Sequence, residues 1–297
     1  MKKLLKYLLI IFVALNLLIL ISGKSWMYKA ISITYLKGHT SSYIHDFMHF
    51  PANTIQVSEH QEWAIGNNYN KAELPEFIKP VNERLETVAF VVIVNDSIQY
   101  EEYWHGYSAD TMSNSFSMSK SWVSTLLGIA ITEGEIRSVN QKVCDFLPNF
   151  CEGKNSELSI QDLLTMSSGL NWTEDYYNPI GQTAEAYYGS DLRGLVSNLK
   201  VIETPGKVFK YHSSCTQLLT LIIEAATGET ISEYASKKLW KPMGAKYPAL
   251  WNTDTEDGDE KGFCCINSNA RDFARLGKLY MHQGHWNGTQ LLDSSYV

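Results

Sequence analysis

Two short apolar runs and a series of longer apolar segments dominate the chain after residue 85. The runs at 87–94 and 97–104 are rich in β-branched and aromatic residues. Asn95-Asp96 between them is a typical tight turn, so we predict a β-hairpin. A two-stranded hairpin is only marginally stable by itself, and we therefore expect other strands to complete its sheet.

Five later segments have the spacing and end signals of helices. Residues 117–133 are apolar on nearly all sides, which indicates a buried helix, and Gly134 is placed to end it. A short helix begins at the capping residue Ser159 and is stopped by Gly169. The remaining predicted helices lie at 215–227, 231–239 and 269–283.

Residues 24–84 show no sustained period, and we interpret them as a linker with an irregular N-terminal elaboration. Before them, lysines at positions 2, 3 and 6 precede an apolar run that ends at Ile21. From Tyr7 the run spans roughly 22 Å, and Leu4 and Leu5 lengthen it towards the roughly 30 Å of a hydrocarbon core. Residues 1–23 are therefore predicted to be a signal anchor or a signal peptide. A buried helix of the fold fits this uniform composition less well.

Two features bear on the choice between anchor and signal peptide. Small residues Ser22 and Gly23 follow the run, but no A-x-A cleavage pattern is present, which favours an uncleaved anchor formed by residues 4–22. Lysines before the run favour a cytoplasmic N-terminus. The expected location is therefore extracytoplasmic, in the periplasm or at the cell surface, with the inner or cytoplasmic membrane as a partner.

The charge of the chain argues against nucleic-acid binding, and its cysteine spacing argues against a structural zinc site. The 297 residues carry a formal net charge of −7 without a block of lysine and arginine, which argues against nucleic acid as a partner. None of the five cysteines forms a C-x-x-C pair, so we expect no structural zinc site. Cys144 and Cys151 either close a small disulfide loop in an oxidising compartment or lie buried as small apolar residues.

The candidate chemistry begins with Ser117-Met118-Ser119-Lys120, an S-x-x-K motif at the start of the predicted buried helix. Residues three positions apart share a helix face, which brings Ser117 and Lys120 together. A serine hydroxyl needs a base to become a good nucleophile, and burial lowers the pKa of a lysine so that it can act as one. By itself the tetrapeptide also fits solvated first-turn residues, with a serine as the helix cap.

A second element comes from the loop before the helix at 215–227. Tyr211 in this loop can act as a general base where a nearby cation, such as Lys120, lowers its pKa. Taken alone, Tyr211 is better explained as a packed aromatic residue. Together with the serine motif, its position favours a catalytic group.

These motifs resemble the serine β-lactamase and penicillin-binding protein superfamily, and within it the class C-like branch that includes esterases, D-aminopeptidases and 6-aminohexanoate-dimer hydrolases. The resemblance runs in family order from about residue 85 to residue 292. The segments that carry it are 117–120, 163–170, 205–211, 217–228, 269–277 and 286–288. It implies an α+β fold for residues 85–297, with a helical subdomain beside an antiparallel sheet and the serine at their junction.

The resemblance also implies roles for individual residues. Ser117 is the expected acylated nucleophile, its N–H is expected to form half of an oxyanion hole, and Lys120 and Tyr211 share the duties of base and acid. The family's second motif is usually Tyr-x-Asn, whereas here Ser213 takes the place of the asparagine as a substrate contact. Tyr176 lies in a region from which the amide-hydrolase branch contacts its substrate. No metal or organic cofactor is implied.

The family's third motif, a Lys-Thr-Gly or His-x-Gly run on a strand, is absent from this sequence, and residues 288–297 show no strand pattern. We therefore expect the C-terminal strands of the sheet to be missing. The sequence predicts a serine hydrolase that cleaves a small-molecule amide or ester through an acyl-enzyme. The alternative is a non-catalytic, membrane-tethered binder or sensor of cell-wall peptides or β-lactams.

Overall fold

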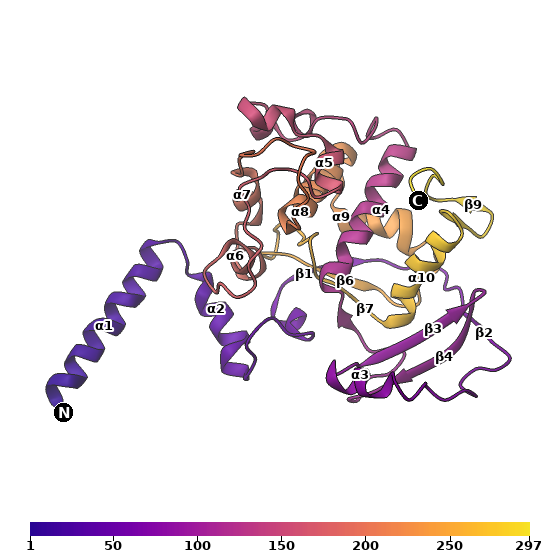
Figure 1. Ribbon diagram of the computed structural model, residues 1–297, viewed down its shortest axis with the longest axis horizontal. Coiled ribbons are helices and arrows are strands. Elements are labelled where there is room, and N and C mark those ends of the chain that lie inside the picture. Colours follow the sequence, from indigo (N-terminus) through magenta and orange to yellow (C-terminus); the bar gives the residue numbers. More distant parts are fainter.

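The computed structural model describes residues 1–297 as helices packed beside small β-sheets, with one helix extending away at the N-terminus (Figure 1). The helices are α1 (Lys2–Ile21), α2 (Trp26–Ile33), α3 (Lys79–Arg84), α4 (Ser119–Thr132), α5 (Ile160–Leu164), α6 (Gln182–Tyr188), α7 (Leu192–Ser197), α8 (Ser213–Thr227), α9 (Ile231–Ala235) and α10 (Ala270–Met281). The strands are β1 (Ala52–Ile55), β2 (Ala64–Ile65), β3 (Ala89–Val94), β4 (Ser97–Tyr103), β5 (Ser113–Asn114), β6 (Ala249–Asn252), β7 (Ile266–Ser268), β8 (His285–Trp286) and β9 (Thr289–Gln290). This is the α+β class that the sequence predicted.

The predicted hairpin is confirmed as β3 and β4, which pair antiparallel. Asn95 and Asp96 in its turn have φ values of +49° and +62°, as the tightest hairpin turn requires. The expected third strand is β2, which pairs in parallel with β4 and gives the order β2-β4-β3. The hairpin sheet therefore takes its extra strand from the N-terminal segment.

A second, fully antiparallel sheet has the order β1-β6-β7-β5. Its strands come from both ends of the chain: Ala52 of β1 pairs with Asn252 of β6. The segment 24–84, expected to be irregular, thus supplies α2, α3 and two strands. Most of these pieces are too short to produce a sustained period in the sequence, because four residues of strand give only two alternations.

The five predicted helices are all present, with shifted ends. Residues 117–133 begin with a 3-10 turn, Phe116–Met118, before α4, and Gly134 follows with a φ of +84°. The helix opened by Ser159 is α5, which ends well before Gly169. The helix predicted at 231–239 continues from α9 as a π-helical turn over Ser236–Trp240.

Helices α4 and α8 pack against each other at the centre of the core (Figure 1). Ser213–Ile223 of α8 are all buried, and α4 is buried on nearly every side, as its apolar composition predicted. Trp122 of α4 contacts Trp240, with the ring centroids 5.0 Å apart. The start of α4 is therefore held rigidly by the helical core.

Helix α1 is long and apolar enough, by length and composition alone, to cross a membrane, and none of its residues is buried. A signal peptide has the same properties. At the other end of the chain, β8 and β9 form a two-residue hairpin, so the expectation of no strand in residues 288–297 is wrong at Thr289 and Gln290.

The cysteines form two pairs. Cys144 and Cys151 are joined by a disulfide, which settles the alternatives that the sequence left open. Cys264 is joined to its neighbour Cys265, and Cys215 is free and buried. The second pair lies just before β7, beside the site described below.

A buried polar network holds the N-terminal half of α10. Asn269 caps the helix, and its side chain accepts the Asp272 N–H at 2.9 Å. The Asp272 carboxylate accepts Arg275 Nε at 2.9 Å, and both side chains are almost completely buried. Arg275 also donates to the carbonyls of Met243, at 2.8 Å, and Gln61, at 2.7 Å. The network therefore joins α10 to segments that lie far away in sequence.

Replacing Arg275 by methionine leaves the Asp272 carboxylate buried without its partner. Breaking one side of a buried ion pair costs about 3–5 kcal/mol, so Arg275→Met is expected to lower the free energy of unfolding by that amount. Urea denaturation followed by circular dichroism measures the change. Arg137→Met is the matched control, because Arg137 pairs with Asp145 at the surface and its loss costs about 1 kcal/mol or less. Equal losses in the two variants would contradict the prediction.

Candidate active site

Ser117 lies in a tight junction between strand β5 and helix α4. The Asn114 side chain accepts the Phe116 N–H at 2.9 Å, and the Ser115 N–H donates to the Ile266 carbonyl of β7 at 2.8 Å. Phe116 has a φ of +43°, in the left-handed region that is costly for a residue with a side chain. The turn is therefore held against the sheet, and Ser117 lines a cavity.

Lys120 lies one helical turn beyond Ser117. Its Nζ is 3.2 Å from Ser117 Oγ and donates to the Phe263 carbonyl at 2.7 Å. Burial lowers the pKa of Lys120 to about 8, although the nearby Glu174 carboxylate acts in the opposite direction. When its nitrogen loses a proton, the contact with Phe263 still uses an N–H and leaves a lone pair available to Ser117.

Tyr211 comes to the same place from the loop before α8. The centre of its ring lies 5.1 Å from Lys120 Nζ. Tyr211 is 38% exposed, so a molecule that binds beside Ser117 can reach it from solvent. The structure thus brings the serine, the amine and the phenol ring together from two distant segments.

Glu174 connects the loop after Leu170 to the start of α8. Its carboxylate accepts Ser213 N–H and Ser213 Oγ, each at 2.7 Å, and Trp172 Nε1 and the Tyr176 hydroxyl, each at 2.6 Å. Burial acts to raise the pKa of Glu174, but these hydrogen bonds outweigh it and the pKa is lowered. Glu174 is therefore a fixed negative charge beside Lys120.

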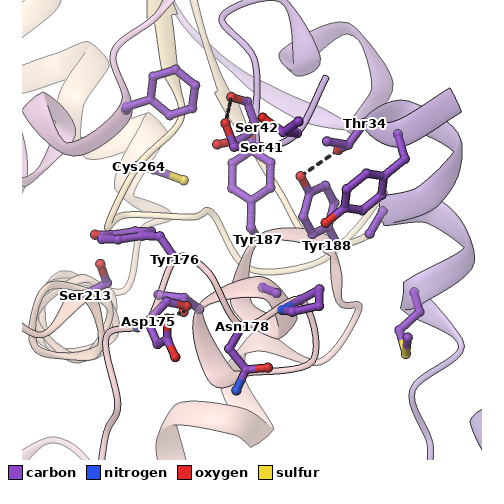
Figure 2. A pocket seen from close by; sticks show the side chains of 18 of the residues that line it. Thr34, Ser41, Ser42, Asp175, Tyr176, Asn178, Tyr187, Tyr188, Ser213 and Cys264 are labelled. Atoms are coloured by element: carbon purple, nitrogen blue, oxygen red, sulfur yellow. Dashed lines mark hydrogen bonds between the residues drawn. The ribbon is translucent and has the colours of Figure 1, made fainter. Parts of the chain in front are cut away.

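The cavity lined by Ser117 also contains Ser213 and Tyr176, the two predicted substrate contacts. Figure 2 shows them together on one side of the cavity, with Tyr188 and Thr34 on the other. The Ser213 hydroxyl donates its proton to Glu174, so only its lone pairs face a ligand. Tyr176 is largely exposed, but partial burial of its hydroxyl, and after it the Glu174 carboxylate, raises the pKa of that hydroxyl.

A family model described as Beta-lactamase matches residues 74–294, which is more than half of the chain. The chain belongs to the beta-lactamase family. The match covers the serine motif, the Tyr211 loop and α10. It does not by itself assign a role to any residue.

Known proteins of related sequence and structure agree with this membership. The chain is 28% identical over 233 residues to 6-aminohexanoate-dimer hydrolase of Paenarthrobacter ureafaciens, covering 73% of this chain and 58% of that protein. The structure of a provisional 6-aminohexanoate-dimer hydrolase from Bacillus anthracis aligns with a TM-score of 0.75 at 23% identity, over 86% of this chain and 71% of that one. A class C beta-lactamase aligns with a TM-score of 0.54 at 18% identity, over 74% and 66%. The chain therefore spans little more than half the length of the curated hydrolase that it matches, and the structural likeness shows the fold.

In this beta-lactamase family member the predicted site residues gather around one position. Ser117, Ser213 and Tyr176 line the cavity, Lys120 contacts Ser117, and Tyr211 flanks Lys120. Glu174 was not predicted. It stands alone in a loop without periodicity, and only the convergence of four donors on its carboxylate distinguishes it from the acidic residue that follows it.

The electrostatics of this family member predict a pH dependence for Ser117. Below a pH of about 8 the Lys120 amine is mainly protonated and cannot accept a proton, so the reaction of Ser117 with a fluorophosphonate should accelerate as the pH rises through about 8. Because Glu174 raises the pKa of Lys120, Glu174→Gln is expected to shift the midpoint to lower pH. The rate of labelling between pH 6 and 10, an interval of roughly two units either side of that pKa, measures both.

Glu59→Gln provides the control for this shift, because Glu59 is exposed and is not among the charges that act on Lys120. Its midpoint is expected to match that of the unmodified chain. A midpoint for Glu174→Gln that stays unchanged or moves to higher pH would show that the carboxylate does not control the amine.

Proposed function

We propose that this chain is a serine hydrolase that cleaves an amide or an ester through an acyl-enzyme on Ser117. The observation that carries the proposal is the position of Lys120 Nζ, 3.2 Å from Ser117 Oγ, with its pKa lowered to about 8 by burial. About half of the amine is neutral at a pH of about 8 and can accept a proton, so the hydroxyl beside it becomes a nucleophile. Membership of the beta-lactamase family supports the same assignment.

In the proposed mechanism Ser117 Oγ bonds to the substrate carbonyl carbon while its proton passes to Lys120, directly or through Tyr211. The Ser117 N–H, at the start of a helix, stabilises the oxyanion that forms. The carbon–nitrogen or carbon–oxygen bond then breaks, and the leaving group takes the proton. Water repeats the same steps on the acyl-enzyme and releases the acid.

Glu174 is proposed to position the groups around Ser117 without contacting the reacting atoms. Its carboxylate holds Ser213 and Tyr176 at the cavity, where they contact the substrate in this proposal. Its negative charge keeps the Lys120 pKa from falling further, so that the amine changes between its two protonation states at a pH of about 8.

The proposed setting is the outer side of a membrane, with α1 as an uncleaved anchor. Its length and apolar composition support this, as do the lysines at its start, which favour a cytoplasmic N-terminus. The small-molecule substrate then reaches the site from the extracytoplasmic side.

A serine-reactive fluorophosphonate provides the test. It is expected to label the chain, and Ser117→Ala should abolish the labelling and lower turnover of p-nitrophenyl acetate by about four orders of magnitude. Ser121→Ala is the matched control, since Ser121 is an exposed serine on the next turn of α4. Mass spectrometry of the adduct identifies the labelled residue.

Two results would refute the assignment. The first is labelling that persists in Ser117→Ala. The second is binding of a fluorescent penicillin without turnover of any amide or ester by the unmodified chain, which would favour the non-catalytic binder instead.

A further inference from the structure

Helix α2 presents a continuous stripe of side chains to the cavity beside Ser117. The lining residues on and after this helix are spaced at i, i+3, i+4, i+7 and i+8, namely Met27, Ala30, Ile31, Thr34 and Tyr35. This spacing places Met27, Ala30 and Ile31 on one face of α2, and Thr34 at the end of the helix and Tyr35 in the following 3-10 turn continue the lining. Here Ile31 and Tyr35 remain 39% and 51% exposed, so part of the stripe faces open space.

Aromatic side chains lie beside α2 in the cavity. Tyr187 and Tyr188 come from α6, which packs against α2, and the Tyr188 hydroxyl is hydrogen-bonded to Thr34 at 2.8 Å (Figure 2). Phe116 and Phe263 line the end beside the nucleophile. A channel with few charged groups therefore leads from Ser117 to α2; 11 of its 21 lining residues are hydrophobic, and the uncharged polar residues Thr40, Ser41, Ser42, Asn178 and Thr183 also line it.

Charge is nearly absent from this channel. Asp175 is the one ionisable acid or base among the lining residues apart from tyrosine and cysteine side chains, and its Oδ1 already accepts the Tyr177 N–H at 3.0 Å. A substrate carboxylate deep in the channel would be desolvated without a cationic side chain in the lining, and an ammonium group would meet Asp175 alone, so either charge loses hydration at a cost. The chemistry of the walls suits a chain of methylene groups.

We propose that this channel binds an aliphatic chain attached to the scissile carbonyl, so that the substrates are amphiphilic esters or amides. This inference rests on the proposed serine hydrolase and names its substrate class. The polar end of the substrate lies at Ser117, Ser213 and Tyr176, and the chain extends along α2.

The position of α2 supports an amphiphile. Only Ser22–Ser25 separate α1 from α2, and at about 3.5 Å per residue this link reaches no further than roughly 18 Å. Where α1 is anchored, α2 and the channel therefore lie close to the membrane surface. Amphiphiles concentrate at that surface, whether they arrive from the bilayer or from solution.

The first test is a series of p-nitrophenyl esters, from acetate through butyrate and hexanoate to octanoate, with the full chain in nanodiscs. Burial of each methylene is expected to raise kcat/KM by about two- to fourfold. Ile31→Ser should reduce the octanoate-to-acetate ratio at least several-fold, whereas Leu36→Ser should leave it unchanged, because Leu36 is exposed nearby but does not line the channel. A flat series, or equal effects of the two variants, would overturn the proposal.

A matched pair of substrates tests whether the near absence of charged residues in the channel lining excludes a charged substrate. The p-nitroanilides of hexanoate and 6-aminohexanoate differ in a terminal ammonium group. Hexanoyl is expected to be cleaved at least about tenfold better, because the ammonium loses its hydration in the channel. A preference for 6-aminohexanoyl would indicate that Asp175 recognises a cation and would overturn the aliphatic assignment.

A third measurement separates failure of this inference from failure of the proposed function. A diazirine-bearing octanoate ester photolabels Ser117→Ala in nanodiscs, where hydrolysis plays no part, and adducts are expected on residues 27–35. Adducts confined to α1 or to the surface would overturn the inference. Fluorophosphonate labelling of the unmodified chain in parallel reports on the hydrolase alone.

Two arms of the same assay distinguish a substrate that enters from the bilayer from one that enters from solution. A monoacylglycerol placed in the nanodisc tests supply from the bilayer, and the dissolved octanoate ester tests supply from solution. Cleavage of either, with the loss in Ile31→Ser, supports the proposal. Cleavage of acetate alone overturns it.

Discussion

The site depends on one amine that is held out of water. Lys120 Nζ lies between the hydroxyl of Ser117, on its own helix start, and the carbonyl of Phe263, on the segment that leads into β7. The contact with Phe263 requires the first turn of α4 to pack directly against that segment. If the two separated, water would hydrate the ammonium and its pKa would return to that of an ordinary lysine.

Several interactions keep that packing in place. Buried Ser119 donates to the Gly262 carbonyl at 2.9 Å, and the backbone of Ser115 is bonded to β7. Behind the turn, α4 is surrounded by the apolar core, which fixes its axis. The strained φ of Phe116 is tolerated because these neighbours leave the turn no other path.

Two further segments complete the surroundings of Ser117. Glu174 fastens its loop to the start of α8, so that Ser213 and Tyr176 face the cavity. From the N-terminal side, α2 closes the cavity with an apolar stripe. The domain that the chain shares with the beta-lactamase family and the segment that follows α1 therefore meet at one place, where the proposed chemistry and the proposed choice of substrate are combined.

The sequence by itself determined the features that depend on near neighbours. The β3–β4 hairpin, the five later helices and the approach of Lys120 to Ser117 follow from periods and spacings within a few residues. The place of Tyr211 in a loop before a helix made it a candidate, and the family resemblance added Ser213 and Tyr176. Only the tertiary structure decided the β1–β6 pairing, the convergence of donors on Glu174 and the lining of the cavity by α2. Those features arise where segments far apart in the chain pack together, and the sequence of one segment does not show which other segment it will contact.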